Sequence, residues 1–268
     1  MLMIRNTQMR AIEESLIRVF EDRTYAHLQK YFPQHCLLLG EGPMRKVIQQ
    51  GWQKAKSYDL TAECCVRSYI EFMCRFGSGF DTDPLLPWAA AILNDRSTMD
   101  QVARGDRLYH QAWDYIDHIS KDYRDDAGQP TTARFMGEIR SLRQGNNEVL
   151  TQSARPDFAR GLELRLETNF PAKCEFVGEE RLQSFIHQAI ESSRTYGITS
   201  ERGTTICAIF LFVLGDGFAN DLLLPWASTV LNDKEIADEI DRVDRLYTEG
   251  VGFLKRWWDS APAQGGLS

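Results

Sequence analysis

Residues 77–95 read GSGFDTDPLLPWAAAILND, and residues 215–233 read GDGFANDLLLPWASTVLND. These two stretches, the first motif and the second motif, are identical at twelve of nineteen positions without a gap and lie 138 residues apart. The same spacing aligns Phe32-Pro33 with Phe170-Pro171, and the Asp-Arg-Leu-Tyr sequence at Asp106 with the one at Asp244. Because one register holds over about eighty residues, the sequence predicts an internal duplication.

Each motif has the composition of a structural corner between two helices. Glycine takes a positive φ at low cost where a helix ends, aspartate is a favoured N-cap, and proline fits the first turn of a helix. A tryptophan after the proline would anchor the corner by burying a large side chain. We assign this structural role to Gly77, Gly79, Phe80, Asp83, Pro87 and Trp88, and to Gly215, Gly217, Phe218, Asp221, Pro225 and Trp226.

The functional alternative for the motifs is a phosphate-binding glycine loop. Such a loop follows a strand and continues into Gly-Lys-Ser/Thr or a third glycine, and the sequence has neither feature here. In addition, Asp81 of the first motif aligns with Ala219 of the second, so that carboxylate is not needed in both copies. The pattern therefore favours a structural role over a catalytic one.

Composition indicates an ordinary globular chain. Of its 268 residues 43% are hydrophobic and 26% are charged, no apolar run is as long as a membrane span, and the N-terminus does not resemble a signal peptide. The six cysteines are scattered without a C-x-x-C pair, which is typical of buried thiols in a reducing compartment, so we expect a cytoplasmic protein. A net charge of −7 disfavours a nucleic-acid partner and favours a basic protein partner. We expect no membrane partner.

The hydrophobic spacing predicts helices throughout and no strand. In the first half we expect a long helix that ends before Pro33, then helices over 41–58, 62–76, Pro87 to Leu93, and 99–119. In the second half we expect one or two helices over 132–169, then helices over 178–196, 200–214, 222–231 and 234–258. The predicted fold is all-α, with two tandem pseudo-repeats of about five helices each. The boundaries are 1–120 for the first repeat, 121–131 for a linker, 132–260 for the second repeat and 261–268 for a flexible tail.

One set of residues has the spacing of a metal site. Asp106, His110, Asp114 and His118 recur every four residues and so share one face of a helix. This face lies opposite the apolar stripe through Leu108, and the aligned positions of the second half keep only one of the four, so we interpret it as a solvated face. We find no catalytic set elsewhere. The sequence therefore predicts a protein that is not an enzyme and has no metal or cofactor.

The motif residues resemble those of a family of bacterial helical proteins. The resemblance consists of Phe-Pro and Gly-Glu, then Gly-x-Gly-Phe-x-x-Asp, Leu-Pro-Trp-Ala and Leu-Asn-Asp, and finally Asp-Arg-Leu-Tyr. Met3-Ile4-Arg5 and Gln8-Met9 look like the opening of that family, and the likeness is strongest over residues 3–109. Members are encoded beside type VI secretion spike proteins and their toxins. The resemblance implies an immunity protein that binds a cognate toxin, or alternatively an effector adaptor or chaperone that loads a toxin onto the spike.

The resemblance brings no binding site with it, because the matched residues shape the fold. Partner-facing surfaces are then expected where the two copies differ. One candidate is the acidic stretch Glu235, Asp238, Glu239 and Asp241, whose counterparts in the first half are mostly uncharged. The cleft between the repeats is the other candidate. An ordinary solvated helix start is the alternative interpretation of the acidic stretch.

Overall fold

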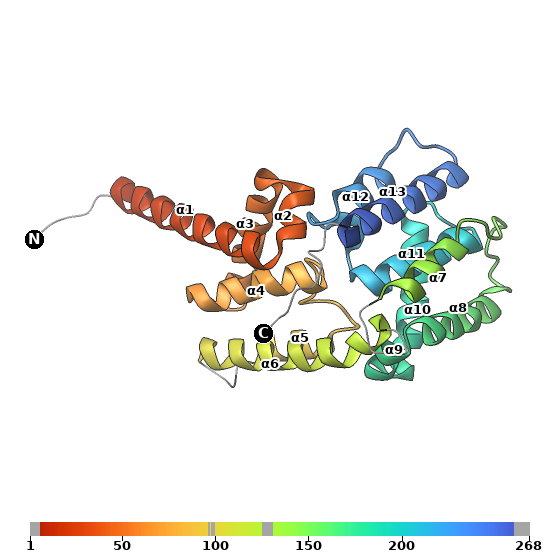
Figure 1. Ribbon diagram of the computed structural model, residues 1–268, viewed down its shortest axis with the longest axis horizontal. Helices are drawn as coiled ribbons and strands as arrows, with labels where there is room; N and C mark the ends of the chain where they lie inside the picture. Colours follow the sequence, from red (N-terminus) through yellow and green to blue (C-terminus); the bar gives the residue numbers. More distant parts are fainter. Residues whose placement is uncertain (1–5, 96, 98–99, 125–130, 260–268) are drawn as a thin grey trace, which may run out of the picture.

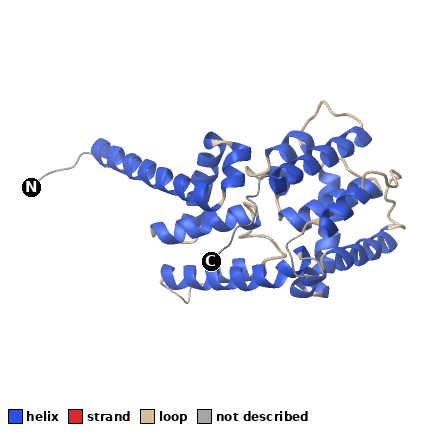
Figure 2. Cartoon of the chain, viewed as in Figure 1, coloured by secondary structure: helices blue, strands red, loops and turns tan. Residues whose placement is uncertain are grey.

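The computed structural model describes residues 6–95, 97, 100–124 and 131–259, and these residues form thirteen α-helices, two short 3-10 helices and no strand (Figures 1 and 2). The all-α prediction is therefore confirmed. Met3-Ile4-Arg5, residues 125–130 of the predicted linker and the predicted tail lie outside the described residues. Within them, no helix is long and apolar enough to cross a membrane.

The first half contains six α-helices. A long helix, α1, extends away from the rest of the molecule at its N-terminal end (Figure 1). Helix α4 ends at a glycine, and α5 begins at a proline, as the motif pattern predicts. The bounds are α1 (Asn6–Tyr31), α2 (Pro33–Leu39), α3 (Glu41–Ser57), α4 (Glu63–Phe76), α5 (Pro87–Leu93) and α6 (Gln101–Ile119), followed by the 3-10 helix η1 (Ser120–Tyr123).

The second half contains seven α-helices, and five of them, α9 to α13, begin 138 residues after α2 to α6. The prediction of about five helices per half missed α2 and α9. Both are seven residues long, too short to show a helical period, and only the proline at the start of each marks them. The bounds are α7 (Ala133–Ser141), α8 (Arg155–Asn169), α9 (Pro171–Val177), α10 (Glu179–Thr195), α11 (Glu201–Leu214), η2 (Phe218–Asn220), α12 (Pro225–Leu231) and α13 (Glu239–Asp259).

Buried apolar side chains from both halves form one continuous core. Helix α11 supplies much of it, since it is apolar on nearly every side, and Phe210 and Phe212 are fully buried. The halves contact each other along two matching lines, with α6 packed on α9 and α13 packed on α2. Each half thus covers the short helix of the other.

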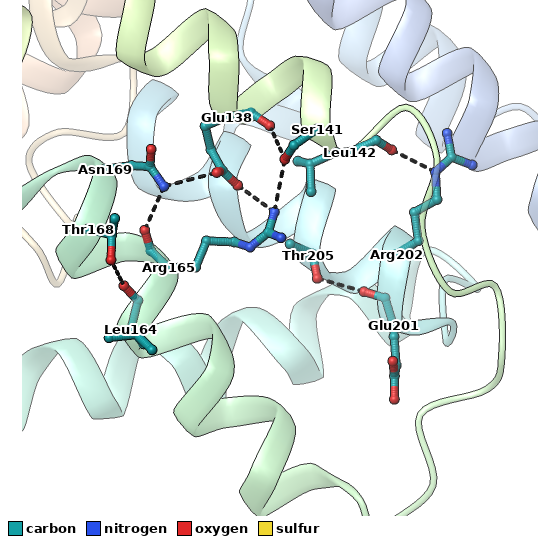
Figure 3. A network of polar contacts seen from close by, with 10 residues as sticks. All are labelled: Glu138, Ser141, Leu142, Leu164, Arg165, Thr168, Asn169, Glu201, Arg202 and Thr205. Carbon is teal, nitrogen blue, oxygen red and sulfur yellow. Dashed lines mark hydrogen bonds and ion pairs between the residues drawn. The ribbon is translucent and has the colours of Figure 1, made fainter.

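A polar network attaches α7 to α8 (Figure 3). The buried Glu138 carboxylate accepts hydrogen bonds from Arg165 Nη1 at 2.6 Å and from Asn169 Nδ2 at 2.9 Å. Nearby, the buried Arg202 of α11 donates from Nε to the Leu142 carbonyl at 2.8 Å, just beyond the end of α7. Because both carboxylate oxygens of Glu138 are satisfied, the network holds α7 in place without an unpaired buried charge.

Two helical glycines test how tightly the core is packed. At Gly250 in α13 an added Cβ would run into the ring of Phe210 and lie 3.1 Å from Trp226, whereas at Gly161 in α8 it would meet no described atom within 4 Å. We expect Gly250→Ala to lower the free energy of unfolding by about 1–3 kcal/mol through overpacking. Gly161→Ala, the matched control, should raise it by about 0.5–1 kcal/mol through helix propensity. Urea unfolding of both variants checks this, and equal effects would contradict the packing.

Candidate functional site

The two motifs meet at the centre of the molecule, where their glycines allow the backbones to touch. Gly77 ends α4 with φ 93°, and an added Cβ would lie 2.7 Å from the carbonyl oxygen of Leu214. Gly215 ends α11 with φ 96°, and its Cβ would lie 2.5 Å from the carbonyl oxygen of Phe76. Both the positive φ and the close approach require glycine at these two positions.

Two buried aspartates hold the motifs together by reciprocal hydrogen bonds. Asp83 Oδ2 accepts from the backbone N–H of Asp216 at 3.0 Å, and Asp221 Oδ2 accepts from that of Ser78 at 2.8 Å. The second oxygen of each stays within its own motif, since Oδ1 of Asp83 accepts from Leu85 N and Oδ1 of Asp221 accepts from Leu223 N, both at 2.8 Å. We call these four hydrogen bonds the aspartate junction.

The aspartate junction corrects the expected N-cap role of Asp83 and Asp221. The residues at the N-cap positions of α5 and α12 are Leu86 and Leu224, and neither has a side-chain cap. The aspartates stand three residues earlier and close the turn before the helix. Burial raises the pKa of Asp221, although the N–H groups of Ser78 and Leu223 oppose this effect.

The other motif residues support the corner from each half. Pro87 and Pro225 lie in the first turns of α5 and α12, and Phe80 and Phe218 are buried. Each tryptophan packs on rings of its own half, so the corner is fixed locally. The ring neighbours are Phe76 and Tyr115 for Trp88, and Phe210, Phe218 and Phe253 for Trp226.

The second glycine of each motif serves a different purpose in the two copies. Gly217 has φ 78°, in the left-handed region, and has open space around it. Gly79 does not have a positive φ, but an added Cβ there would lie 2.6 Å from the carbonyl oxygen of Asp216. The same residue type is thus required by backbone conformation in one copy and by close approach in the other.

Asp81 has a structural role that is confined to the first half. Its buried carboxylate pairs with Lys54 Nζ at 3.0 Å and accepts from the Tyr58 hydroxyl at 3.1 Å. Burial, together with Asp81, raises the pKa of Tyr58 to about 12. In the second half, Ser192 stands at the position aligned with Lys54, and Ala219 stands at the position aligned with Asp81. Both members of the charged pair are therefore absent there.

Glu239 of the predicted partner-binding set is engaged inside the protein. Its carboxylate accepts from Thr199 N at 2.8 Å and Ser200 N at 2.7 Å, at the start of α11. The aligned residue Gln101 accepts from the backbone at the start of α4 in the same way. Both side chains therefore cap a helix through an oxygen, and the predicted role of Glu239 in partner binding stays a prediction.

The rest of the acidic stretch is exposed. Glu235, Asp238 and Asp241 line a shallow hollow on the surface, and Asp238 also caps α13 by accepting from Asp241 N at 3.1 Å. The remaining lining residues of this hollow are Ile236, Ala237, Asp244, Arg245, Thr248 and Glu249. Five carboxylates and one arginine line it, and one of the carboxylates, Asp244, is paired with Arg202 Nη1 at 2.6 Å, so the hollow has a net negative charge. The structure leaves its predicted role in partner binding untested.

A cavity of about 400 Å³ lies between the halves, beside the aspartate junction. We call it the central cavity. Its apolar wall consists mainly of aromatic rings, and three cationic or imidazole side chains come from three different helices. Residues that line it include Tyr31, Phe32, His35, Arg75, Phe76, Asp83, Tyr115, Lys173 and Trp257. It is the structural counterpart of the expected cleft between the two halves.

His35 and Lys173, which the 138-residue spacing aligns, both line the central cavity. The His35 ring packs edge-on against Trp257, with 4.1 Å between the ring centroids. Its Nδ1 is buried and has no hydrogen-bond partner among the described residues. Burial lowers the pKa of His35 to about 3. Lys173 Nζ donates to the Phe212 carbonyl, and burial lowers its pKa although Asp83 opposes this. The neutral imidazole and the lysine were missed by sequence reasoning, because seven α-helices and the 3-10 helix η1 contribute to this cavity.

The helix face with metal-like spacing is largely solvated. Asp106, His110 and Asp114 are exposed on α6, while His118 lies 3.4 Å from Glu175 Oε2 of α9. Within the described part of the chain, no group of three or more His, Cys, Asp or Glu residues is placed to hold a metal ion. These four residues therefore do not converge on one point.

Comparison of the chain with protein-family models, with curated proteins and with solved structures finds no match. The likeness to a toxin-associated bacterial family therefore stays a prediction based on motif residues. The toxin partner and the absence of catalysis stay predictions as well. The proposals below depend on the residues and contacts of this chain.

The aspartate junction generates a stability prediction. Asp83→Ala leaves two buried N–H groups, of Leu85 and Asp216, without an acceptor, so the free energy of unfolding should fall by about 2–4 kcal/mol. Asp83→Asn keeps one of the two acceptors and should have an intermediate effect. Asp114→Ala on the exposed face of α6 is the control, with a change within about 0.5 kcal/mol. Chemical denaturation measures all three, and an Asp83→Ala variant as stable as the control would contradict the junction.

His35 generates a pH prediction. Its folded-state pKa of about 3 is below the ordinary 6.5, so the unfolded chain takes up a proton first and stability is lost as the pH falls below 6.5. Burial is the cause of this lowered pKa, and the charged groups that line the same cavity are Arg75, Lys173 and Asp83. Between pH 6.5 and pH 5 the wild type should lose about 2 kcal/mol more than His35→Leu. Parallel pH dependences in urea titrations of the two proteins would contradict a buried neutral His35.

Proposed function

We propose that the protein is a non-catalytic bacterial immunity protein that binds and neutralises a cognate type VI secretion toxin through a protein–protein interface. The observation that carries the proposal is the acidic hollow at the start of α13, lined by five carboxylates and one arginine. Beside it Ile240 is 47% exposed, which adds an apolar contact to a charged rim. Such a surface attracts a basic partner and fixes its orientation.

We also infer that the chain is an internal duplication. Residues that the two copies share maintain the fold, and residues that differ between the copies bind the partner. Five pairs of helices with 138-residue spacing and the reciprocal aspartate junction support this inference. Glu235, Asp241 and Glu249 of the hollow align with Ser97, Ala103 and Gln111, so three of its five carboxylates belong to the second half alone. The hollow is therefore a difference between the copies that no shared structural role explains.

The rival proposal is an adaptor or chaperone that loads a toxin onto the secretion spike. One observation favours it: α1 extends from the body and carries Leu16, 65% exposed, and Val19, 43% exposed (Figure 1). Exposed apolar side chains on a projecting helix are a means of holding a second protein. The two proposals differ in one outcome, because loss of an immunity protein harms the cell that makes the toxin, whereas loss of an adaptor prevents its delivery.

Co-expression with the toxin encoded by the adjacent gene tests the proposal. The wild type should rescue growth and co-purify with the toxin. Glu235→Lys/Asp238→Asn/Asp241→Lys should lose both, because it reverses the charge of the hollow while an asparagine at 238 can still cap α13. Growth counts and the dissociation constant of the purified pair are the measurements.

The matched control is Asp157→Lys/Glu167→Gln/Glu180→Lys, which makes the same total charge change at exposed positions of the same half. It should rescue growth as the wild type does. If the hollow variant and the control variant lost growth rescue equally, the effect would be one of general charge, and this would contradict the hollow as the interface. A toxin complex with only a millimolar dissociation constant, or healthy cells that lack the protein while retaining the toxin, would contradict immunity itself.

A further inference from the structure

We propose that the central cavity binds a small organic acid with an aromatic body, whose carboxylate is held by Lys173 and Arg75 and whose ring lies among the aromatic side chains. This site is separate from the acidic hollow and does not depend on the toxin. It is formed jointly by the two halves. Four observations lead to this ligand class.

The cavity has the size and walls of a small-molecule site. Its volume of about 400 Å³ falls within the range of ligand pockets, which are mostly apolar with a few placed polar groups. Phe32, Phe76, Tyr115 and Trp257 contribute rings from both halves. An aromatic body of one or two rings fits such walls by stacking or edge-to-face contact.

The charged groups of the cavity select an anion. Arg75 lies over the rings of Phe32 and Trp113, 4.9 and 5.0 Å from their centroids, and has no carboxylate partner among the described residues. Lys173 Nζ has three N–H donors, and one of them donates a hydrogen bond to the Phe212 carbonyl. Asp83, the one carboxylate that lines the cavity, has both oxygens engaged by backbone N–H groups. Two cations thus retain free N–H donors, whereas both oxygens of the carboxylate that the described residues contribute to the lining already accept hydrogen bonds.

His35 supplies a polar atom that lacks a partner. The residue is 6% exposed, and its Nδ1 makes no hydrogen bond within the described structure. A buried polar atom without a partner is costly, and such atoms in native proteins call for an explanation. His35 lines the central cavity, so it adds to the cavity wall an imidazole whose hydrogen-bonding capacity the protein does not use up.

A second, smaller cavity supports the assignment by contrast. It has about 180 Å³ and is lined by Asp221, Leu224, Phe253 and Leu254, the aligned counterparts of Asp83, Leu86, Tyr115 and Ile116 in the central cavity. No lysine lines it. The smaller cavity shares the side chains of His35, Arg75 and Trp257 with the central cavity, and of the two only the central cavity is also lined by the lysine.

Calorimetric titration of the full chain with benzoate, phenylacetate and indole-3-acetate tests the proposal, with the corresponding amides as uncharged controls. At least one acid should bind saturably with 1:1 stoichiometry, and its amide should bind at least about tenfold more weakly. Lys173→Met should weaken binding of that acid by about tenfold or more, and Arg75→Gln, at an exposed position, provides a second variant that retains the fold.

Lys46→Met, which removes an exposed lysine on α3 far from the cavity lining, is the matched control and should bind as the wild type does. Circular dichroism establishes that each variant is folded. The proposal is overturned if none of the three acids binds saturably at millimolar concentration, if acid and amide bind equally, or if both cavity variants retain full affinity.

Discussion

The reciprocal hydrogen bonds of Asp83 and Asp221 are the constraint on which the rest of the structure depends. Each carboxylate accepts one N–H group from its own turn and one from the opposite motif. Burying an ionised carboxylate without partners costs free energy. Hydrogen bonds to a charged group offset this cost more strongly than hydrogen bonds between two neutral groups do. The aspartate junction therefore fixes the position of one half relative to the other more precisely than apolar packing alone would.

The glycines make this contact possible, and the packing of the helices follows from it. With Gly77 and Gly215 in backbone contact with the opposite motif, α4 and α11 end at the same place, and the neighbouring helices fill the space around them. Helix α6 then covers α9, while α13 covers α2. The two cavities adjoin each other beside this contact, since both are lined by His35, Arg75 and Trp257.

Helix positions could be predicted from the sequence because glycine, proline and apolar spacing act locally. The role of Asp83 could not, since its second partner is an N–H group 133 residues away in the chain. An aspartate three residues before the N-cap of α5 looks like a cap until that partner is known. The cap formed by Glu239 could not be predicted either, since its partners Thr199 and Ser200 lie about forty residues away in the chain.

Differences between the two halves carry the functional argument. At the cavity, the aligned pair is His35 and Lys173. At the surface, three of the five carboxylates of the hollow align with uncharged residues, and the other two align with aspartates. The acidic hollow and the central cavity are two places where aligned positions differ in charge while the aspartate junction is present in both halves.

Native-state hydrogen exchange at the backbone amides of Ser78 and Asp216 tests the central claim most directly. Both lie outside the helices, so local structure alone would give them little protection. If the aspartate junction holds the halves together, both amides should exchange only with the slowest, globally protected amides of α11. Exchange at the rate of an exposed loop, while α11 stays protected, would contradict the account.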